Sequence, residues 1–397
     1  MMKTIQSRWP VYSEDEIDAV TSVLRSGKVN YWTGEECRRF EKEFARFCGA
    51  EYAVALSNGT VALELALRSL QIGDGDEVIV SSRTFLASAS AIVVVGAIPV
   101  FSDVDPDSQN STAETIAAVL TERTKAIIAV HLAGWPCDMD SIMELACANG
   151  LKVVEDCAQA HGAKYKGRSV GSIGDVGAWS FCQDKIMTTG GEGGMLTTNN
   201  PEVWEYAWSY KDHGKSWDSV YNTKHSSGFR WLHESWGTNW RMTEVQAAIG
   251  RIQIRKMAEW GQLRRCNAEA ILSVGEEFSA FLRIPRPSVE IEHGYYKCYL
   301  FVRPDSLKGE WGRNKILSEL VARRIPCFVG SCPEVYLEKV FKGTGFRPKE
   351  RLPVAKKLGQ TSLMFLVHPT LSKDEIDLTC NMIREVMQLV EKECILL

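Results

Sequence analysis

Hydrophobic and polar positions in the first 200 residues alternate between two periods. Short runs of consecutive apolar residues, typical of strands buried on both faces, occur at residues 52–56, 77–81, 98–101, 126–130, 152–155, 176–180 and 195–198. Between several of these runs, apolar residues recur every three or four positions, as in helices, at residues 60–70, 113–120 and 139–149. Strands alternating with helices predict an α/β fold, in which helices flank a mostly parallel, seven-stranded sheet.

The two ends of the chain predict further helices and a second, smaller domain. Ser13 and Glu16 have the spacing of a capping box and predict the start of a helix. A long helix is predicted from about residue 243 to residue 266, and short strands and helices alternate after it. We therefore predict an N-terminal segment and large domain over residues 1–255, and a smaller C-terminal α/β domain over residues 256–397.

Residues 213–237 fit neither period. This segment carries three tryptophans among polar residues, and it is longer than an ordinary connection between two elements. Long loops of this kind usually serve binding or catalysis, so we predict a functional loop.

Composition and charge narrow the class of protein. The formal net charge is -4 over 397 residues, which gives no support to nucleic-acid binding. The N-terminus lacks the apolar core of a signal peptide, and the twelve cysteines contain no C-x-x-C pair. We expect a soluble cytoplasmic protein with reduced cysteines and no metal site, which binds a small molecule or a second copy of itself.

Candidate chemistry lies where the predicted strands end, because ligands of open α/β sheets bind at the carboxyl ends of the strands. There is no G-x-G-x-x-G motif after a strand and no Walker A motif, which argues against a dinucleotide or nucleoside triphosphate site. Gly59 and Thr60 begin a helix whose free N–H groups suit a phosphate, although an ordinary helix cap has the same sequence pattern. Phe85 lies just past the second strand, either as a core residue or as a plate for a flat ligand.

Two charged residues complete the set. Glu155 and Asp156 end an apolar run, and a buried acid needs a cationic or hydrogen-bonded partner. Lys185 follows the sixth strand, which ends at Ser180. A pyridoxal phosphate site requires a lysine for a Schiff base, an acid for the pyridinium nitrogen and donors for the phosphate.

At these residues the chain resembles the DegT/DnrJ/EryC1/StrS family of sugar aminotransferases, which have the fold-type-I architecture of pyridoxal phosphate enzymes. The resemblance covers about residues 10–390, and its matching stretches, in order, are NGTVALELAL, TFLASASAI, HLAGWPCDMD, VVEDCAQAHGAKYKGRSVG, GDVGAWSFCQDKIMTTGGEGGML and GTNWRMTEVQAAIGRIQ.

The resemblance implies a role for each matching position. Lys185 corresponds to the lysine that forms the Schiff base with pyridoxal 5'-phosphate, and Asp156 to the partner of the pyridinium nitrogen. Asn239 corresponds to an asparagine that reaches the cofactor phosphate of the neighbouring subunit, which implies a homodimer with shared active sites. The other implied cofactor contacts are those of Gln159 with the ring hydroxyl, Phe85 with the ring face, and Gly59, Thr60 and Ser180 with the phosphate.

The resemblance also implies the reaction. An amino group moves from an amino acid, with L-glutamate as the expected donor, to a keto-sugar that is expected to be nucleotide-linked, in the biosynthesis of an amino sugar for a surface polysaccharide or a secondary metabolite. Three alternatives stay open: an aminocyclitol aminotransferase, an aminodehydratase of the 3-amino-5-hydroxybenzoate synthase type, and a sensor with this fold that has no catalytic activity.

The loop at residues 213–237 also carries candidate residues for binding the acceptor. Its cations lie among aromatic residues, which suits a sugar diphosphate, and an interface loop with packed tryptophans explains it equally well. The residues that we predict to bind the acceptor are His213, Lys215, Lys224 and Arg230.

Overall fold

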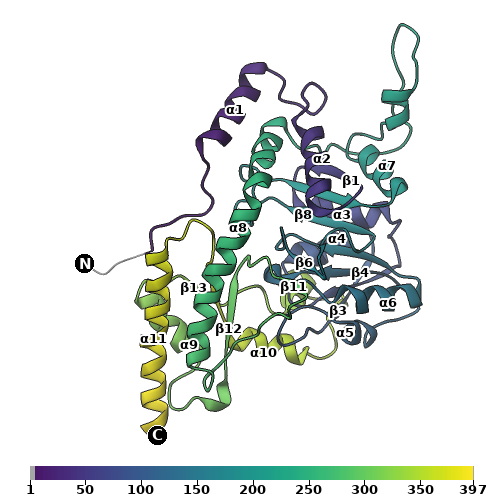
Figure 1. Cartoon of the computed structure of the whole chain (residues 1–397). Helices are drawn as coiled ribbons and strands as arrows, with labels where there is room; N and C mark the ends of the chain where they lie inside the picture. Colours follow the sequence, from purple (N-terminus) through teal and green to yellow (C-terminus); the bar gives the residue numbers. More distant parts are fainter. Residues whose placement is uncertain (1–4, 397) are drawn as a thin grey trace.

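The computed structural model describes the backbone of residues 5–396 and the side chains of residues 5–394. Its largest sheet has seven strands in the order β1-β9-β8-β5-β4-β2-β3 (Figure 1). Strand β9 runs antiparallel to both of its neighbours, and the other strands are parallel. The strands are β1 (Tyr52–Leu56), β2 (Glu77–Ser81), β3 (Ile98–Ser102), β4 (Thr124–Val130), β5 (Lys152–Asp156), β8 (Val176–Ser180) and β9 (Gly194–Thr198). The predicted fold class and all seven predicted strands are confirmed.

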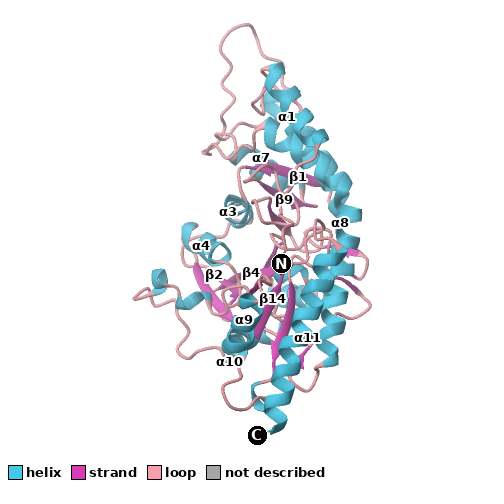
Figure 2. Cartoon of the chain, turned by 90° about the vertical axis from the view of Figure 1, so that its left-hand side faces the viewer, coloured by secondary structure: helices cyan, strands magenta, loops and turns pink. Residues whose placement is uncertain are grey.

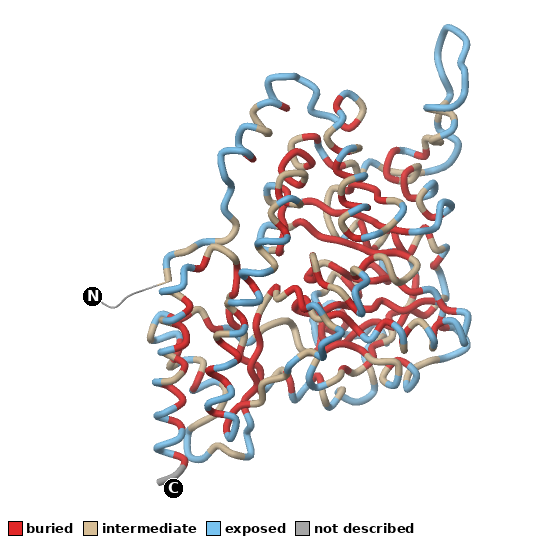
Figure 3. The backbone as a smooth tube through the Cα atoms, in the orientation of Figure 1, coloured by how far each residue is buried: buried red, intermediate tan, exposed pale blue. Residues whose placement is uncertain are grey.

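Helices cover both faces of this sheet because successive strand residues point to opposite sides. In β4, Ile128 belongs to the apolar cluster that includes α2 and α3, whereas Ile127 belongs to the cluster formed with α5 and α6. Most residues of the sheet are therefore buried, as Figure 3 shows, and Lys125 and Lys152 are exposed near the starts of β4 and β5. The helices of this part of the chain are α2 (Glu36–Cys48), α3 (Gly59–Ser69), α4 (Leu86–Val94), α5 (Ala113–Ala117), α6 (Met139–Asn149) and α7 (Pro201–Tyr210).

A smaller second sheet forms around a separate apolar cluster. Its strands are β10 (Leu282–Arg283), β12 (Cys298–Val302), β14 (Ser362–Phe365) and β13 (Cys327–Phe328), in that order. The helices beside it are α9 (Arg313–Ala322), α10 (Pro353–Thr361) and α11 (Lys373–Leu396). A third, three-stranded sheet joins β11 (Ile291–Glu292) to β6 (Lys164–Tyr165) and β7 (Arg168–Ser169).

One long helix links the large sheet to the second sheet. Helix α8 (Glu244–Glu277) packs against α2 at one end and against α11 at the other, and Figure 2 shows α8 and α11 side by side. The prediction ended this helix near residue 266, and the structure extends it to Glu277. The extension packs Ala268, Ile271 and Leu272 into the apolar cluster of the second sheet. Helix α8 crosses residue 255, where the two predicted domains meet, and that division stays a prediction.

The other predicted helices differ from the structure in small ways. Helix α1 (Glu14–Ser26) begins with the predicted capping box, because Ser13 N–H donates to Glu16 at 2.8 Å. Helix α5 ends at Ala117 rather than at residue 120. Within the described residues, no helix is long and apolar enough to span a membrane. All twelve cysteines lie in the described part of the chain and carry free thiols.

The segment 213–237 projects from the body of the molecule. It forms the exposed arm beside α7 at the upper right of Figures 1 and 3, and it contains one short π-helix, Asp218–Asn222. The side chains of Trp231 and Trp236 are 82% and 95% exposed. Exposed apolar residues in one segment usually mark a surface that another molecule covers.

Candidate active site

A cavity of about 960 Å³ opens at the carboxyl ends of the parallel strands. The structure brings seven of the predicted site residues to its wall, although they are spread over more than a hundred positions of the chain. These residues are Gly59, Thr60, Phe85, Asp156, Gln159, Ser180 and Lys185. Predicted residues that lie outside this cavity are Asn239, His213, Lys215, Lys224 and Arg230.

The N-terminus of α3 forms one end of the cavity. Asn58 caps the helix by accepting a hydrogen bond from Val61 N–H at 3.0 Å, and the first N–H groups of any helix lack acceptors within the helix. Gly59 lies so close to β8 that a Cβ atom at this position would come within 2.5 Å of the Ser180 Cβ. A glycine is therefore required here. The result is a group of N–H and hydroxyl donors, from Gly59, Thr60 and Ser180, that can hold a phosphate.

The carboxylate of Asp156 lies buried at the end of β5. Its Oδ2 accepts a hydrogen bond from the Ser88 hydroxyl at 2.7 Å, and its Oδ1 accepts one from Ala158 N–H at 3.1 Å. The Ser88 hydroxyl is also 2.7 Å from that of Thr84. Among the described residues, no cation pairs with Asp156. A buried acid that lines a cavity and lacks a cation is suited to a cationic group of a ligand.

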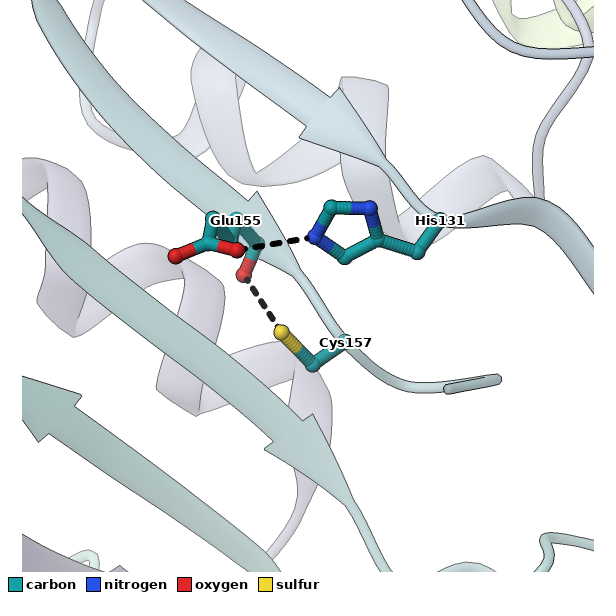
Figure 4. A group of neighbouring side chains, drawn as sticks. All are labelled: His131, Glu155 and Cys157. Carbon is teal, nitrogen blue, oxygen red and sulfur yellow. Dashed lines mark hydrogen bonds and ion pairs between the residues drawn. The ribbon is translucent and has the colours of Figure 1, made fainter. Parts of the chain in front are cut away.

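Glu155, the residue before Asp156, points to the opposite face of β5 and forms a separate cluster with His131 and Cys157 (Figure 4). Its carboxylate is 3.0 Å from His131 Nε2 and accepts hydrogen bonds from the N–H groups of Gly171, Ile173 and Gly174. The other ring nitrogen of His131 accepts Cys137 N–H at 3.0 Å, so the imidazole is neutral and donates from Nε2 to Glu155.

The types of these three residues would suit a metal ion, and their ligand atoms lie within 4.8 Å of one another. However, both ring nitrogens of His131 are engaged in hydrogen bonds, and the Glu155 carboxylate accepts four. The cluster therefore works as an internal brace between β4, β5 and the turn at residues 171–174. The sequence pointed to Glu155 but gave no signal for His131.

Lys185 lies in the loop between β8 and β9. Its backbone carbonyl accepts a hydrogen bond from the Trp9 indole N–H at 2.7 Å, so the N-terminal segment holds this loop in place. Its Nζ is 5.2 Å from the centre of the Tyr296 ring, and the Tyr296 hydroxyl donates to Asp184. Burial, together with the charges of Lys185 and a nearby arginine, lowers the pKa of His161 to about 3, so this neighbouring imidazole is neutral.

Two further side chains complete the wall of the cavity. Gln159 Oε1 accepts Ala133 N–H at 2.8 Å, which leaves the amide NH₂ group available as a donor to a ligand. Phe85, at the N-cap of α4, is 67% exposed and presents an aromatic face at the cavity. The cavity thus combines a primary amine, a buried acid, an amide donor, an aromatic face and a phosphate cradle.

Comparison with known proteins identifies the family. The sequence profile of the DegT/DnrJ/EryC1/StrS aminotransferase family matches residues 10–384. The chain belongs to this family. It is 34% identical over 384 residues to the GDP-perosamine synthase of Escherichia coli O157:H7, which covers 97% of this chain and 99% of that protein.

A solved structure and a second relative support the same conclusion. The aminotransferase from Psychrobacter cryohalolentis is 59% identical in sequence, and it superposes with a TM-score of 0.96 over 97% of this chain and 99% of that one. The L-glutamine:2-deoxy-scyllo-inosose aminotransferase of Streptoalloteichus tenebrarius is 38% identical over 268 residues, which are 66% of this chain and 63% of that protein. The predicted family and the predicted class of enzyme, an aminotransferase, are confirmed.

The second half of this aminotransferase contributes cavity residues that the sequence did not reveal. They come from β12, β13, β14 and the neighbouring turns, and they are Tyr296, Lys297, Phe328, Gly330, Ser331, Cys332, Met364 and Leu366. These residues reach the cavity only because the small sheet packs against the large one. No local sequence motif could therefore have identified them.

The predicted acceptor-binding residues lie on or beside the exposed arm. His213, Lys224 and Arg230 are exposed, and none lines the cavity of its own chain. Lys215 instead forms an ion pair with Asp212 at 3.2 Å and lies 4.1 Å from the centre of the Trp32 ring. Asn239, which pairs with Asp212 in an isolated β-bridge, is exposed as well.

Proposed function

We propose that this aminotransferase uses pyridoxal 5'-phosphate to move an amino group from an amino acid, with L-glutamate as the expected donor, to a nucleotide-linked keto-sugar, and so makes an amino sugar. The observation that carries the proposal is that Lys185 and the buried Asp156 line one cavity, at whose end a phosphate cradle lies. The similarity to GDP-perosamine synthase supports the sugar acceptor.

The residues of the cavity fit this cofactor. The N–H and hydroxyl donors at the start of α3 and the end of β8 match its phosphate. Within the described part of the chain, no cation forms an ion pair with the Asp156 carboxylate, which matches a ring N–H. Phe85 offers an aromatic face to a flat ring, and the free NH₂ group of Gln159 can donate to a ring hydroxyl.

When bound, pyridoxal phosphate supplies an electron sink for the charge that develops at the donor α-carbon. Lys185 Nζ provides the amine that holds the cofactor aldehyde, and after its release the same nitrogen moves the α-proton as a general base. Asp156 keeps a proton on the ring nitrogen by accepting its hydrogen bond. The Ser88 hydroxyl and Ala158 N–H fix the carboxylate in the position for this task.

We further propose that the working unit is a homodimer with shared active sites. Asn239 lies outside the cavity of its own chain, which agrees with a role in which Asn239 of the partner subunit reaches the cofactor phosphate. The 67% exposure of Phe85 and the exposed apolar residues of the 213–237 arm also favour a covered surface.

The arm is the proposed binding element for the acceptor diphosphate. Arg230 and Lys224 are exposed cations on it that make no ion pair with a described residue, whereas Lys215 is already paired with Asp212. A guanidinium is well suited to a diphosphate. Arg230→Glu should raise the acceptor KM much more than the donor KM, and equal effects on both would contradict this part of the proposal.

The test of the proposed function is spectroscopic and then kinetic. The purified enzyme with pyridoxal phosphate should show the absorbance of a protonated lysine Schiff base and should lose it with L-glutamate. Lys185→Ala should abolish the absorbance, while Lys164→Ala, which removes a half-buried lysine that pairs with Glu292 outside the cavity, should leave it unchanged. A panel of acceptors should then include keto-sugar nucleotides, an inosose and the precursor of an aminobenzoate. Turnover of only the inosose or only the aminobenzoate precursor would replace the sugar proposal.

A further inference from the structure

A second lysine lines the cavity, opposite the elements that carry the expected cofactor contacts. Lys297 lies directly before β12, in the half of the chain that forms the small sheet. Of the described residues that line the cavity, only Lys185 and Lys297 carry a cationic side chain. The role of Lys185 is to hold the cofactor, so Lys297 is the cation that remains for a substrate.

The two ammonium groups lie on the same aromatic ring. Lys185 Nζ is 5.2 Å and Lys297 Nζ is 4.5 Å from the centre of the Tyr296 ring, so the two nitrogens are separated by no more than the sum of these distances. Both contacts with the ring are cation–π contacts, which hold a cation only weakly unless it is desolvated. Lys297 is therefore within reach of a small molecule that reacts at Lys185.

The charge of Lys297 is not balanced within the described part of the protein. Its Nζ makes no hydrogen bond and no ion pair with a described residue, and the nearby acid Asp184 is bonded to the Tyr296 hydroxyl. Burial lowers the pKa of Lys297 to about 8; Asp184 opposes this effect, and the positive charges of Arg264 and Lys185 add to it. A largely buried ammonium that repels two cations and lacks an acid partner would be stabilised by a bound anion.

The amino donor brings such an anion to this point. Every α-amino acid carries a carboxylate one carbon from the nitrogen that must react at the cofactor, so its charge necessarily enters the cavity beside Lys185. A nucleotide-linked keto-sugar carries its negative charges on the diphosphate, beyond the sugar ring and away from the reacting ketone. The phosphate of the cofactor has its own donors at the start of α3, on the large-sheet side.

We propose that the ammonium of Lys297 binds a carboxylate of the amino donor and thereby positions the donor for its reaction at Lys185. The proposal rests on the proposed function only in requiring an amino-acid donor. It adds a binding residue for the donor and assigns it to the segment directly before β12.

Donor binding should then depend on pH in one direction. The groups around Lys297 are Asp184 and Lys185 from the loop after β8, Arg264 from α8, His368 from the segment after β14, and the hydroxyl-bearing ring of Tyr296. Burial and the charges of Arg264 and Lys297 lower the pKa of His368 to about 4, so His368 does not change its charge in the range where Lys297 titrates. Lys297 is charged below a pKa of about 8, so donor binding should weaken as the pH rises through that value. The acceptor should not share this dependence.

The experiment measures the donor half-reaction alone. The holoenzyme is mixed with increasing L-glutamate without an acceptor, and the loss of Schiff-base absorbance gives a half-saturating concentration and a limiting rate. Lys297→Met should raise the half-saturating concentration about ten- to hundredfold, which is the effect of losing one charge-assisted hydrogen bond, and should change the limiting rate by less than about threefold. Lys297→Arg should restore most of the affinity. Lys315→Met, which removes an exposed lysine of α9, should behave as the wild type.

A second readout needs no turnover. Glutarate, a dicarboxylate without an amine, should bind the wild-type holoenzyme in calorimetry and lose affinity by a similar factor in Lys297→Met. Unchanged glutamate and glutarate affinities in Lys297→Met would overturn the proposal. An increase in the acceptor KM with no change for the donor would also overturn it, because it would assign Lys297 to the sugar.

This experiment separates the two proposals. A wild-type enzyme that reacts with glutamate but with no keto-sugar nucleotide would contradict the proposed acceptor and leave the donor test intact. If Lys297→Met fails to fold or to hold the cofactor, which its absorbance reveals, Lys297→Gln and the pH dependence of glutarate binding to the wild type provide the same test.

Discussion

Substitution of Glu155 by glutamine tests the buried brace behind the active site. The Glu155 carboxylate is fully buried and accepts four hydrogen bonds of 2.7–3.0 Å: one from His131 at Oε2, one from Gly171 at the same oxygen, and two at Oε1 from Ile173 and Gly174. Glutamine has nearly the same shape, so the change removes a charge and one acceptor without opening a cavity.

The structure allows the cost to be worked out. In either orientation of the amide, its NH₂ group replaces an oxygen that accepts two N–H donors. His131 cannot adapt by moving its proton, because Nδ1 already accepts Cys137 N–H. Two N–H groups that donated to the carboxylate would thus face the NH₂ group of the glutamine, which is itself a donor. Each hydrogen bond to a buried charge contributes about 1.5–3 kcal/mol. We expect Glu155→Gln to destabilise the fold by about 3–5 kcal/mol.

Thermal unfolding is the assay. An unfolding entropy of about 2.1 cal/mol/K per residue gives roughly 0.8 kcal/mol/K for 397 residues, so the loss corresponds to a decrease of about 4–6 °C in Tm. The control is Glu144→Gln, an exposed glutamate on α6, which should leave Tm unchanged. A Tm for Glu155→Gln that stays within about 1 °C of the wild type would refute the brace.

Thermal unfolding at acidic pH provides a second test with the same variant. Burial would raise the pKa of Glu155, but His131 and the N–H groups of Gly174 and Gly171 hold it below its ordinary value. The stability that this carboxylate contributes is therefore complete above its unfolded pKa and is lost as the pH falls through its folded pKa. The Tm difference between wild type and Glu155→Gln should be constant near neutral pH and should narrow in acid.

Three further outcomes follow from the site. Coexpression of Lys185→Ala with Asn239→Ala subunits should restore about one quarter of the wild-type activity, because half of the randomly assorted dimers would contain one intact shared site; no restoration would contradict shared sites. Trp9→Phe, which removes the indole N–H bonded to the Lys185 carbonyl, should lower kcat about three- to tenfold, whereas Trp260→Phe, a neighbouring ring with no such bond, should not. Ser88→Ala should weaken pyridoxal phosphate binding about tenfold in a fluorescence titration, because the buried carboxylate at the end of β5 loses a donor.

The local pattern of apolar residues was sufficient to predict most of the helices and strands. Runs such as residues 77–81 and 176–180 coincide with β2 and β8, because a strand buried on both faces needs consecutive apolar residues wherever it lies in the sheet. The end of α8 could not be predicted from the local pattern. No glycine or proline marks a stop near residue 266, and the helix continues because the second sheet covers its next three turns.

The sequence by itself determined the layer architecture and placed Phe85, Asp156 and Lys185 after strands, whose carboxyl ends gather at one edge of a parallel sheet. The roles expected of these residues toward a cofactor came from the resemblance to the family. The resemblance to the family selected Asp156 rather than Glu155 for the cofactor, and the structure places Asp156 in the wall of the cavity and Glu155 on the opposite face of β5.

Only the tertiary structure decided the partners of these residues: His131 for Glu155, Ser88 for Asp156, and Lys297, directly before β12, in the same cavity as Lys185. A side chain acquires such a neighbour from the packing of distant segments, and neither the hydrophobic period nor the capping of a single segment carries that information.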